Sequence, residues 1–155
     1  MTRKMLMALA AAGSAAMLLG AFGFQYIGGL LPCAMCLWQR WPHAAAVLLG
    51  LIGMAVPHAI IAWAGALSAA VTSGLGAYHF GVEQKWWEGP TSCTGSGDAL
   101  SGLTGNDLLS LDGPTGVILC DEIVWELFGI TMAGYNFLIS GLLALIWVAA
   151  ALRKN

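Results

Sequence analysis

Charged residues are scarce in this chain: Asp, Glu, Lys and Arg make up only 9% of it, whereas 59% of the residues are hydrophobic. A soluble domain usually carries about 25% charged residues. The shortfall therefore excludes an ordinary soluble domain and indicates a membrane protein. The six lysines and arginines form no stripe of the kind that binds nucleic acid. No internal repeat is evident, and the length suits a single membrane domain over residues 1–155.

Long uncharged stretches take the place of the missing charges. A membrane-spanning helix needs about 20 mostly apolar residues, and residues 5–24, 59–80 and 132–152 each meet this without one charge. A further span over residues 35–56 must include Gln39, Arg40 and His43 in its first turns, and Pro57 ends it. The sequence thus predicts an all-α membrane protein, a four-transmembrane-helix bundle with loops at residues 25–34 and 81–131.

The few charges are distributed unevenly along the chain. Both ends are basic, with Arg3 and Lys4 at one and Arg153 and Lys154 at the other, and all eight acids lie within residues 83–126. Lys and Arg collect on the cytoplasmic side of membranes. Four spans then place both termini in the cytoplasm and both loops outside. A cleaved signal peptide is the alternative for the first stretch, but its apolar run is longer than usual and cleavage would leave three spans.

The second outer loop changes character along its length. Residues 89–116 hold seven glycines, which is typical of a flexible segment. In the following "CDEIVWELFGI", the apolar Ile123, Leu127 and Ile130 recur at helical spacing, and Trp125 suits the headgroup level. This pattern predicts a short interfacial helix. The alternative is that the segment simply begins the last span.

Four cysteines are present, but the patterns for haem and zinc are not. The pair Cys33 and Cys36 forms a C-x-x-C, yet no histidine follows it, which excludes the C-x-x-C-H pattern of haem attachment. Cys93 and Cys120 lie 27 positions apart in a glycine-rich loop, a spacing that fits a structural zinc site poorly. The sequence therefore predicts redox chemistry and no metal.

The stretch "PCAMCLWQR" suits a redox role. Pro32 readily starts a helix, so Cys33 and Cys36 should lie in a first turn, where a helix N-terminus favours the reactive thiolate. Arg40 follows Cys36 by one turn on the same face, where it either stabilises a thiolate, hydrogen-bonds a cofactor carbonyl, or snorkels to the interface. His79 ends the third span at the same level and is a candidate for the same pocket.

The remaining histidines, His43 and His58, are interpreted as interfacial or loop residues. Two pairs of thiols on one side of a membrane suggest a relay, because disulfide exchange proceeds through mixed disulfides. The loop thiols can meet an aqueous partner, and the C-x-x-C lies where a lipid-soluble acceptor can approach.

These features together resemble the bacterial disulfide-bond formation protein B (DsbB) family of inner-membrane thiol:quinone oxidoreductases. The resemblance covers most of the chain and is carried by "PCAMCLWQR", "YHFGVEQKWWEGPTSC" and "CDEIVWELFGITMAGYN". It implies that the chain reoxidises a periplasmic DsbA-like thioredoxin-fold protein and passes the electrons to ubiquinone or menaquinone. It also implies an inner-membrane location with periplasmic cysteines.

The resemblance further implies a role for each matching residue. The redox-active disulfides are Cys33–Cys36 and Cys93–Cys120. Cys93 matches the cysteine that the reduced partner attacks, Cys120 would exchange with Cys33, and Cys36 matches the cysteine that engages the quinone. Arg40 matches the quinone-side arginine, and His79 resembles the quinone-proximal histidine with a spacing that differs by one residue.

Two other functions compete with this one. A vitamin K epoxide reductase-like enzyme would share the four spans, the C-x-x-C and the quinone, but its active pair usually lies near the end of a late span. A non-enzymatic membrane scaffold with structural disulfides would keep Cys33 and Cys36 oxidised and would not depend on Arg40.

Overall fold

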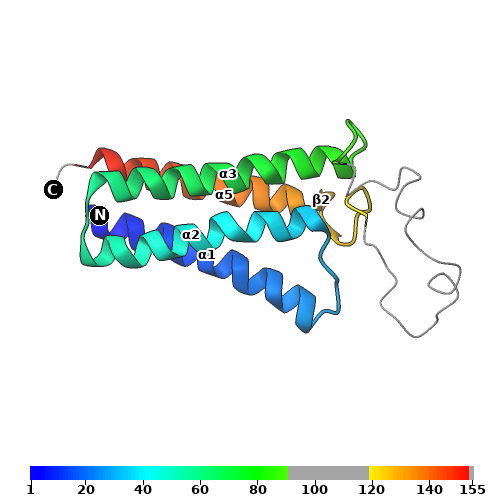
Figure 1. The fold of residues 1–155 in the computed structure, drawn as a ribbon, viewed down its shortest axis with the longest axis horizontal. Coiled ribbons are helices and arrows are strands. Elements are labelled where there is room, and N and C mark those ends of the chain that lie inside the picture. The colour runs from blue at the N-terminus through cyan, green and yellow to red at the C-terminus, as the bar shows by residue number, and fades with distance from the viewer. Residues whose placement is uncertain (91–118, 154–155) are drawn as a thin grey trace, which may run out of the picture.

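The computed structural model describes residues 1–90 and 119–153, and within these residues four helices lie side by side (Figure 1). The elements in these ranges are α1 (Arg3–Tyr26), α2 (Ala34–Ala55), α3 (Ala59–Glu83), β1 (Glu126–Leu127), β2 (Ile130–Thr131) and α5 (Met132–Leu152). The helices run along the long axis, and both ends of the chain lie at one end of the bundle (Figure 1). α3 packs against α2 and α5, and α1 packs against α2 and α5.

The uncharged stretches of the sequence correspond closely to the helices. Helix α5 has the predicted bounds of residues 132–152, and α3 extends beyond the predicted residue 80 to Glu83. Three helices, α1, α3 and α5, are long and apolar enough to cross a membrane. The all-helical bundle is thus confirmed, whereas α2 as a fourth span stays a prediction.

Each helix in the described part of the chain begins at a side chain that satisfies a backbone N–H of its first turn. The capping residues are Thr2 for α1, Cys33 for α2, His58 for α3 and Thr131 for α5. Such caps replace hydrogen bonds that the first turn of a helix lacks. The use of Cys33 as a cap has a chemical consequence, because it fixes the sulfur over the N-terminus of α2.

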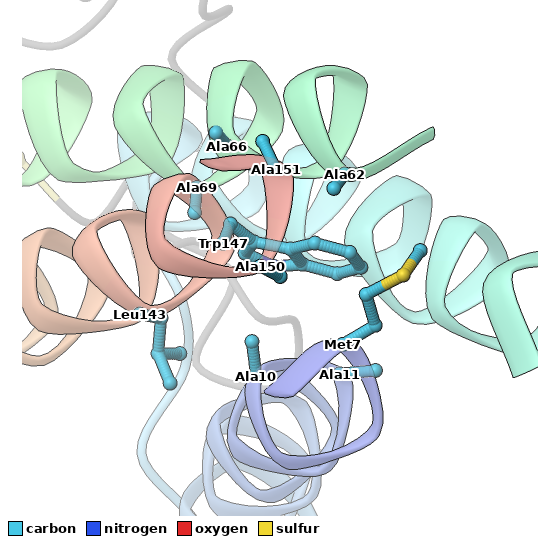
Figure 2. Packing of buried hydrophobic residues seen from close by; sticks show 10 residues of the cluster. All are labelled: Met7, Ala10, Ala11, Ala62, Ala66, Ala69, Leu143, Trp147, Ala150 and Ala151. Atoms are coloured by element: carbon cyan, nitrogen blue, oxygen red, sulfur yellow. The ribbon is translucent and has the colours of Figure 1, made fainter. Parts of the chain in front are cut away.

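Small residues bring the helices into close contact around one large side chain near the chain ends (Figure 2). The buried cluster consists of Met7, Ala10, Ala11, Ala62, Ala66, Ala69, Leu143, Trp147, Ala150 and Ala151. Alanine and glycine let helix backbones approach closely, which is the usual way for apolar helices to associate in lipid. Trp147 is completely buried within this cluster.

Arg3 stabilises the same end of the bundle by hydrogen bonds to backbone carbonyls. Its guanidinium donates to the carbonyl of Ala150 at 3.1 Å, to that of Pro57 at 3.2 Å, and to that of Arg153. These carbonyls lie at the end of α5 and in the turn between α2 and α3. One side chain of α1 therefore binds the end of α5 and the turn between α2 and α3, at the end of the bundle that lies away from the cysteines.

The prediction of a helix over residues 121–130 is wrong. Strands β1 and β2 pair antiparallel there, with Glu126 opposite Thr131 and Leu127 opposite Ile130. Phe128 (φ 52°) and Gly129 (φ 77°) both have positive φ, as a two-residue hairpin turn requires. A helix cannot pass through this pair, so the helical spacing of the apolar residues was misleading.

Gly65 is one of the positions at which close packing leaves no room for a side chain. A Cβ there would lie 2.5–2.6 Å from three ring atoms of Trp147. We expect Gly65→Ala to lower the free energy of unfolding by about 1–3 kcal/mol, because the buried indole must shift. The measurement is reversible unfolding of the purified protein in mixed detergent micelles.

Gly74→Ala on the same helix is the matched control, since a Cβ at Gly74 has nothing within 4 Å. Alanine in a helix is favoured over glycine by about 0.5–1 kcal/mol, so this variant should be as stable as the parent or more so. Equal stability of the two variants would contradict the packing around Trp147.

Candidate thiol–disulfide site

Cys33 and Cys36 lie at the end of the bundle that is opposite the chain termini. Both cysteines are free, and their Sγ atoms are 2.9 Å apart. The Cys33 sulfur also accepts the backbone N–H of Cys36 at 3.2 Å, which is the capping bond of α2. The structure thus confirms that the pair opens a helix, as Pro32 predicted.

Two residues from distant parts of the chain join Cys33. The Sγ of Cys33, a ring nitrogen of His79 and the Sγ of Cys120 all lie within 4.8 Å of one another, and all three residues are buried. The Nε2 of His79 is 3.6 Å from the Cys33 sulfur. Three segments of the chain, namely the start of α2, the end of α3 and the segment before β1, therefore bring two sulfurs together around one imidazole.

The two sulfurs are in different oxidation states. Cys33 is a thiol, whereas Cys120 is disulfide-bonded. Cys93, which the sequence analysis assigned as the mate of Cys120, lies outside the described residues. An oxidised sulfur beside a reduced one is the arrangement that disulfide exchange needs, since a thiolate attacks a disulfide sulfur directly.

The surroundings of Cys33 favour its protonated form at rest. The hydrogen bond with Cys36 and, secondly, burial raise the pKa of the Cys33 thiol above its ordinary value. The backbone N–H of Cys36 acts in the opposite direction, because it stabilises the thiolate. Cys120 contributes no thiolate while it is disulfide-bonded, so the three convergent ligand atoms do not form a thiolate metal site in this state.

A carboxylate closes one side of the site. Glu83 is buried at the end of α3, and its Oε1 lies 3.8 Å from His79 Nε2. Its other oxygen accepts the hydroxyl of Thr131, and that hydroxyl in turn accepts the N–H of Gly134 at 3.2 Å. The cap of α5 therefore also provides the partner for a buried carboxylate.

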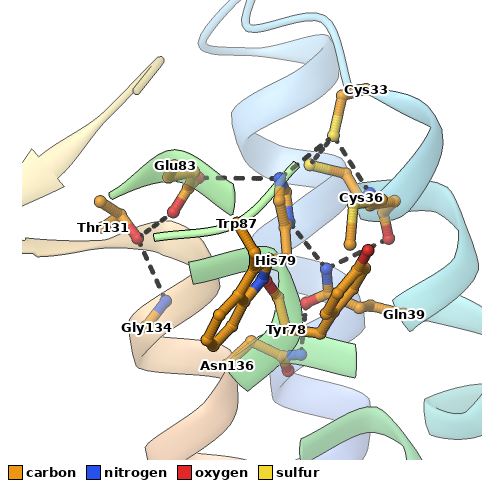
Figure 3. A network of polar contacts seen from close by, with 11 residues as sticks. Cys33, Cys36, Gln39, Tyr78, His79, Glu83, Trp87, Thr131, Gly134 and Asn136 are labelled. Atoms are coloured by element: carbon orange, nitrogen blue, oxygen red, sulfur yellow. Dashed lines mark hydrogen bonds and ion pairs between the residues drawn. The ribbon is translucent and has the colours of Figure 1, made fainter. Parts of the chain in front are cut away.

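A chain of hydrogen bonds leads from His79 into the bundle (Figure 3). Gln39 Nε2 is 3.0 Å from His79 Nδ1, and Asn136 Nδ2 donates to Gln39 Oε1 at 2.5 Å. Asn136 Oδ1 is 2.9 Å from His43 Nε2 and accepts the Ser140 hydroxyl at 2.9 Å. Polar side chains of α2, α3 and α5 thus pair with one another, although the buried Nδ1 of His43 has no partner among the described residues.

Arg40 faces α1 instead of the thiols. Its guanidinium donates to Gln25 Oε1 at 2.6 Å and lies 4.9 Å above the ring of Phe22. Its buried Nε has no hydrogen-bond partner among the described residues. The side chain is thus held by α1, and within these residues it retains one unused donor.

A largely apolar cavity of about 320 Å³ connects these groups. It runs between α1 and the other helices, and its lining includes Cys33, Cys36, Arg40, His79 and Trp125. A cavity of this size is within the range of small-molecule sites. The aromatic ring of Trp125 packs against those of Phe24 and Tyr135, which places the hairpin segment over the cavity.

The structure brings together most of the residues selected from the sequence. Cys33, Cys36, Arg40 and His79 all line one cavity, and Cys120 lies beside Cys33 and His79. His43 was expected at the interface, but it is buried and bonded to Asn136. His58 is exposed and caps α3, as a loop residue can.

Sequence reasoning did not assign roles to Gln39, Glu83, Thr131 and Asn136. The signal for them was present, since a polar side chain in an apolar stretch must find a partner. Their pairing could not be deduced, because the partners lie on different helices and 40 or more positions apart.

The fold and the site define a helical membrane protein with a thiol–disulfide centre. The family model of disulfide bond formation protein DsbB matches residues 3–150. The chain belongs to the DsbB family, which supports an oxidoreductase function in disulfide bond formation.

Three relatives illustrate the similarity, and each is named disulfide bond formation protein B. The protein from Verminephrobacter eiseniae is 32% identical, with 98% of this chain and 88% of the relative aligned. The protein from Dechloromonas aromatica is 27% identical over 88% of this chain and 89% of the relative. The protein from Albidiferax ferrireducens is 30% identical over 86% and 80%. No solved structure matches the chain.

Thr131 holds two buried groups, so its replacement tests this part of the site. We expect Thr131→Val to lower the free energy of unfolding by about 2 kcal/mol, because α5 loses its cap and Glu83 loses its donor. Unfolding in mixed detergent micelles measures the change. Thr131→Ser keeps the hydroxyl and should restore most of the stability.

Thr2→Val is the matched control for the cap alone, because Thr2 caps α1 at an exposed position. Its cost should be about 1 kcal/mol or less. A cost for Thr131→Val no larger than that for Thr2→Val would show that Glu83 does not depend on Thr131.

Proposed function

We propose that this protein oxidises a periplasmic DsbA-like dithiol protein and passes the two electrons to a membrane quinone. The loop pair Cys93–Cys120 would exchange with the dithiol partner, and the pair Cys33–Cys36 would reduce the quinone. In the overall reaction two thiols become one disulfide, and their two electrons and two protons convert the quinone to a hydroquinone. The chain would thereby sustain disulfide formation in other proteins.

The observation that carries this proposal is the approach of Cys120 to Cys33. Their sulfurs lie within 4.8 Å of each other although the residues are 87 positions apart. Exchange between two pairs requires such an approach. Cys36 lines the adjoining cavity, so the same pair can address a molecule bound there.

The residues that line the cavity fit a quinone. The lining is mostly apolar, and the Nε–H of Arg40 is a buried donor without a partner in residues 1–90 and 119–153, which suits a carbonyl oxygen. When bound, a quinone supplies a two-electron acceptor. Arg40 would hold it, Cys36 would face it, and the aromatic Trp125 and Phe24 would limit the access of water.

The two alternative functions are less well supported. The match to the DsbB family covers residues 3–150, which favours that family over a vitamin K epoxide reductase-like enzyme. A structural scaffold gives no reason for Cys120 to lie within 4.8 Å of the Cys33 sulfur, whereas disulfide exchange requires it. This approach thus supports a redox function for the C-x-x-C.

The proposed location is the bacterial inner membrane, with four spans, both termini in the cytoplasm and the cysteines in the periplasm. The termini lie together at one end of the bundle, and Cys33, Cys36 and Cys120 lie toward the other (Figure 1). The basic residues at the ends of the chain support the cytoplasmic side for the termini.

The function can be tested with purified components. The protein is mixed with a reduced DsbA-type partner and ubiquinone, and the absorbance of the quinone is followed. We expect quinone reduction with the parent protein and none with Cys36→Ser, because the electrons can no longer leave the C-x-x-C pair. Menaquinone in a parallel assay would identify the preferred acceptor.

Ala44→Ser is the matched control, since Ala44 is exposed on the same helix and lies outside the cavity lining. It should leave the rate unchanged. Failure of the parent protein to reduce either quinone, or full activity of Cys36→Ser, would refute the proposed electron path.

The orientation can be tested on intact cells. After reduction, a membrane-impermeant maleimide applied from outside should label Cys93, since the second loop is proposed to be periplasmic. Labelling that requires disruption of the inner membrane would reverse the topology. A cysteine introduced at Arg153 should show the opposite pattern, because the carboxyl end is proposed to be cytoplasmic.

A further inference from the structure

The orientation of the Gln39 carboxamide can be deduced from its neighbours. Gln39 Nε2 lies 3.1 Å from the carbonyl oxygen of Met35. A carbonyl oxygen can only accept a hydrogen bond, so the Gln39 atom that faces it must be the NH₂ group. The other end, Oε1, accepts from Asn136 Nδ2 at 2.5 Å, which agrees with this orientation.

The orientation of Asn136 is fixed in the same way. Its Nδ2 lies 3.2 Å from the carbonyl oxygen of Thr72, again a pure acceptor, so this atom must also be an NH₂ group. Its Oδ1 accepts the Ser140 hydroxyl. Two backbone carbonyls thus determine both amides independently, and the two assignments are mutually consistent.

Gln39 determines the protonation of His79 as a result. The Nε2 group of Gln39 that donates to Met35 also faces His79 Nδ1 at 3.0 Å. An NH₂ group is a donor, so Nδ1 must be the unprotonated, accepting nitrogen of the ring. The hydrogen of the neutral imidazole is therefore on Nε2, on the side of the thiols (Figure 3).

The Nε2–H of His79 faces two acceptors, namely the sulfur of Cys33 and the backbone carbonyl of Cys120. The Cys33 Sγ lies 3.6 Å from Nε2 and also accepts the backbone N–H of Cys36 at 3.2 Å. Two N–H donors from different helices thus converge on one sulfur. Donors of this kind stabilise a thiolate more than a thiol, because a hydrogen bond to a charged acceptor is stronger.

The other charged or titratable groups around His79 are few among the described residues. Cys120 approaches from the segment before β1, where its backbone carbonyl accepts a hydrogen bond from the His79 ring. Because Nδ1 accepts from Gln39, this hydrogen is also the one on Nε2. Glu83 lies on the same helix, with 3.8 Å between its Oε1 and Nε2, which is too long for a direct hydrogen bond. A carboxylate there favours a doubly protonated ring, and the Gln39 donor opposes it.

We propose that Gln39 is a positioning residue for thiol–disulfide exchange: it holds His79 as the Nε2–H tautomer, which donates to the Cys33 thiolate. This rests on the proposed function for the exchange step itself. In the exchange step, another thiolate attacks the Cys120 sulfur of a Cys33–Cys120 disulfide and forms a new sulfur–sulfur bond to Cys120. The bond between Cys33 and Cys120 breaks, and its electron pair passes to Cys33. The two N–H donors then stabilise the negative charge of the Cys33 thiolate.

In this arrangement His79 does not act as the base for Cys33. Its Nε2 already carries a hydrogen, and its Nδ1 is occupied by Gln39. The imidazole therefore acts as a donor to a developing negative charge, and it stays neutral throughout. Gln39 acts only through His79 and contacts neither sulfur within hydrogen-bond distance.

The tautomer can be measured directly by nuclear magnetic resonance. Two-bond ¹H–¹⁵N correlation on the full-length, ¹⁵N-histidine-labelled protein in detergent distinguishes a protonated from an unprotonated ring nitrogen, and His79→Phe assigns the signals. We expect unprotonated Nδ1 and protonated Nε2 in the parent protein. A protonated Nδ1 at neutral pH would overturn the proposal.

Gln39→Glu replaces the hydrogen-bond donor that faces Nδ1 of His79 with an acceptor. An ionised carboxylate only accepts, so Nδ1 should become protonated, while Asn136 can still donate to the carboxylate. Ser73→Ala is the matched control, because Ser73 is buried on α3 but bonds only the carbonyl of Phe137. If Gln39→Glu leaves the tautomer unchanged, Gln39 does not position His79.

The link to Cys33 is tested by a double-mutant cycle that needs neither quinone nor partner. In the full-length chain with Cys33 as the only cysteine, the rate of alkylation by iodoacetamide is measured against pH. His79→Phe should slow the reaction by about tenfold near neutral pH, because a donor to the thiolate is lost. Gln39→Leu should slow it less, and should have no further effect in the His79→Phe background.

Equal effects of Gln39→Leu with and without His79 would show that Gln39 acts by another route and would overturn the proposal. A failure of the proposed function gives a different result. Quinone reduction would then be absent in the parent protein, while the tautomer and the coupling to Cys33 alkylation would remain as expected.

Discussion

The carboxamide of Asn136 joins the three helices that form the site. It bonds Gln39 of α2, Thr72 of α3 and Ser140 of its own helix α5, and all of these side chains are buried. Inside an apolar bundle these polar groups cannot hydrogen-bond to water. Each hydrogen bond between them therefore stabilises one relative position of the helices. The site around Cys33 depends on this arrangement, because Gln39 and His79 belong to different helices.

The two ends of the bundle are built differently, and the difference creates the cavity. Alanine and glycine bring the helices together around Trp147 near the chain termini, where Arg3 also binds three carbonyl groups. Toward the cysteines, α1 diverges from the other helices (Figure 1). The space that opens there is lined by Phe24, Arg40 and Cys36. Tight packing near the chain termini thus holds the helices together, while the cavity near the cysteines stays open to a bound molecule.

Hydropathy was sufficient to locate the helices, and chemistry was sufficient to select the cysteines. Residues 132–152 carry no charge, and α5 has those bounds. The hairpin at β1 and β2 was missed because its turn depends on the positive φ of Phe128, which local sequence rarely indicates. The meeting of Cys33 with Cys120, and of Gln39 with Asn136, depends on how the helices are arranged, which one sequence does not specify.

The directions of the hydrogen bonds also bear on proton movement. A continuous line of polar contacts runs from Cys33 through His79, Gln39 and Asn136 to His43. A line of this kind through a membrane protein is a potential leak, yet two of its members are carboxamides, which neither gain nor lose a proton near neutral pH. The two carboxamides therefore interrupt the line as a path for protons. Protons that leave the thiols do not pass along it from His79 to His43.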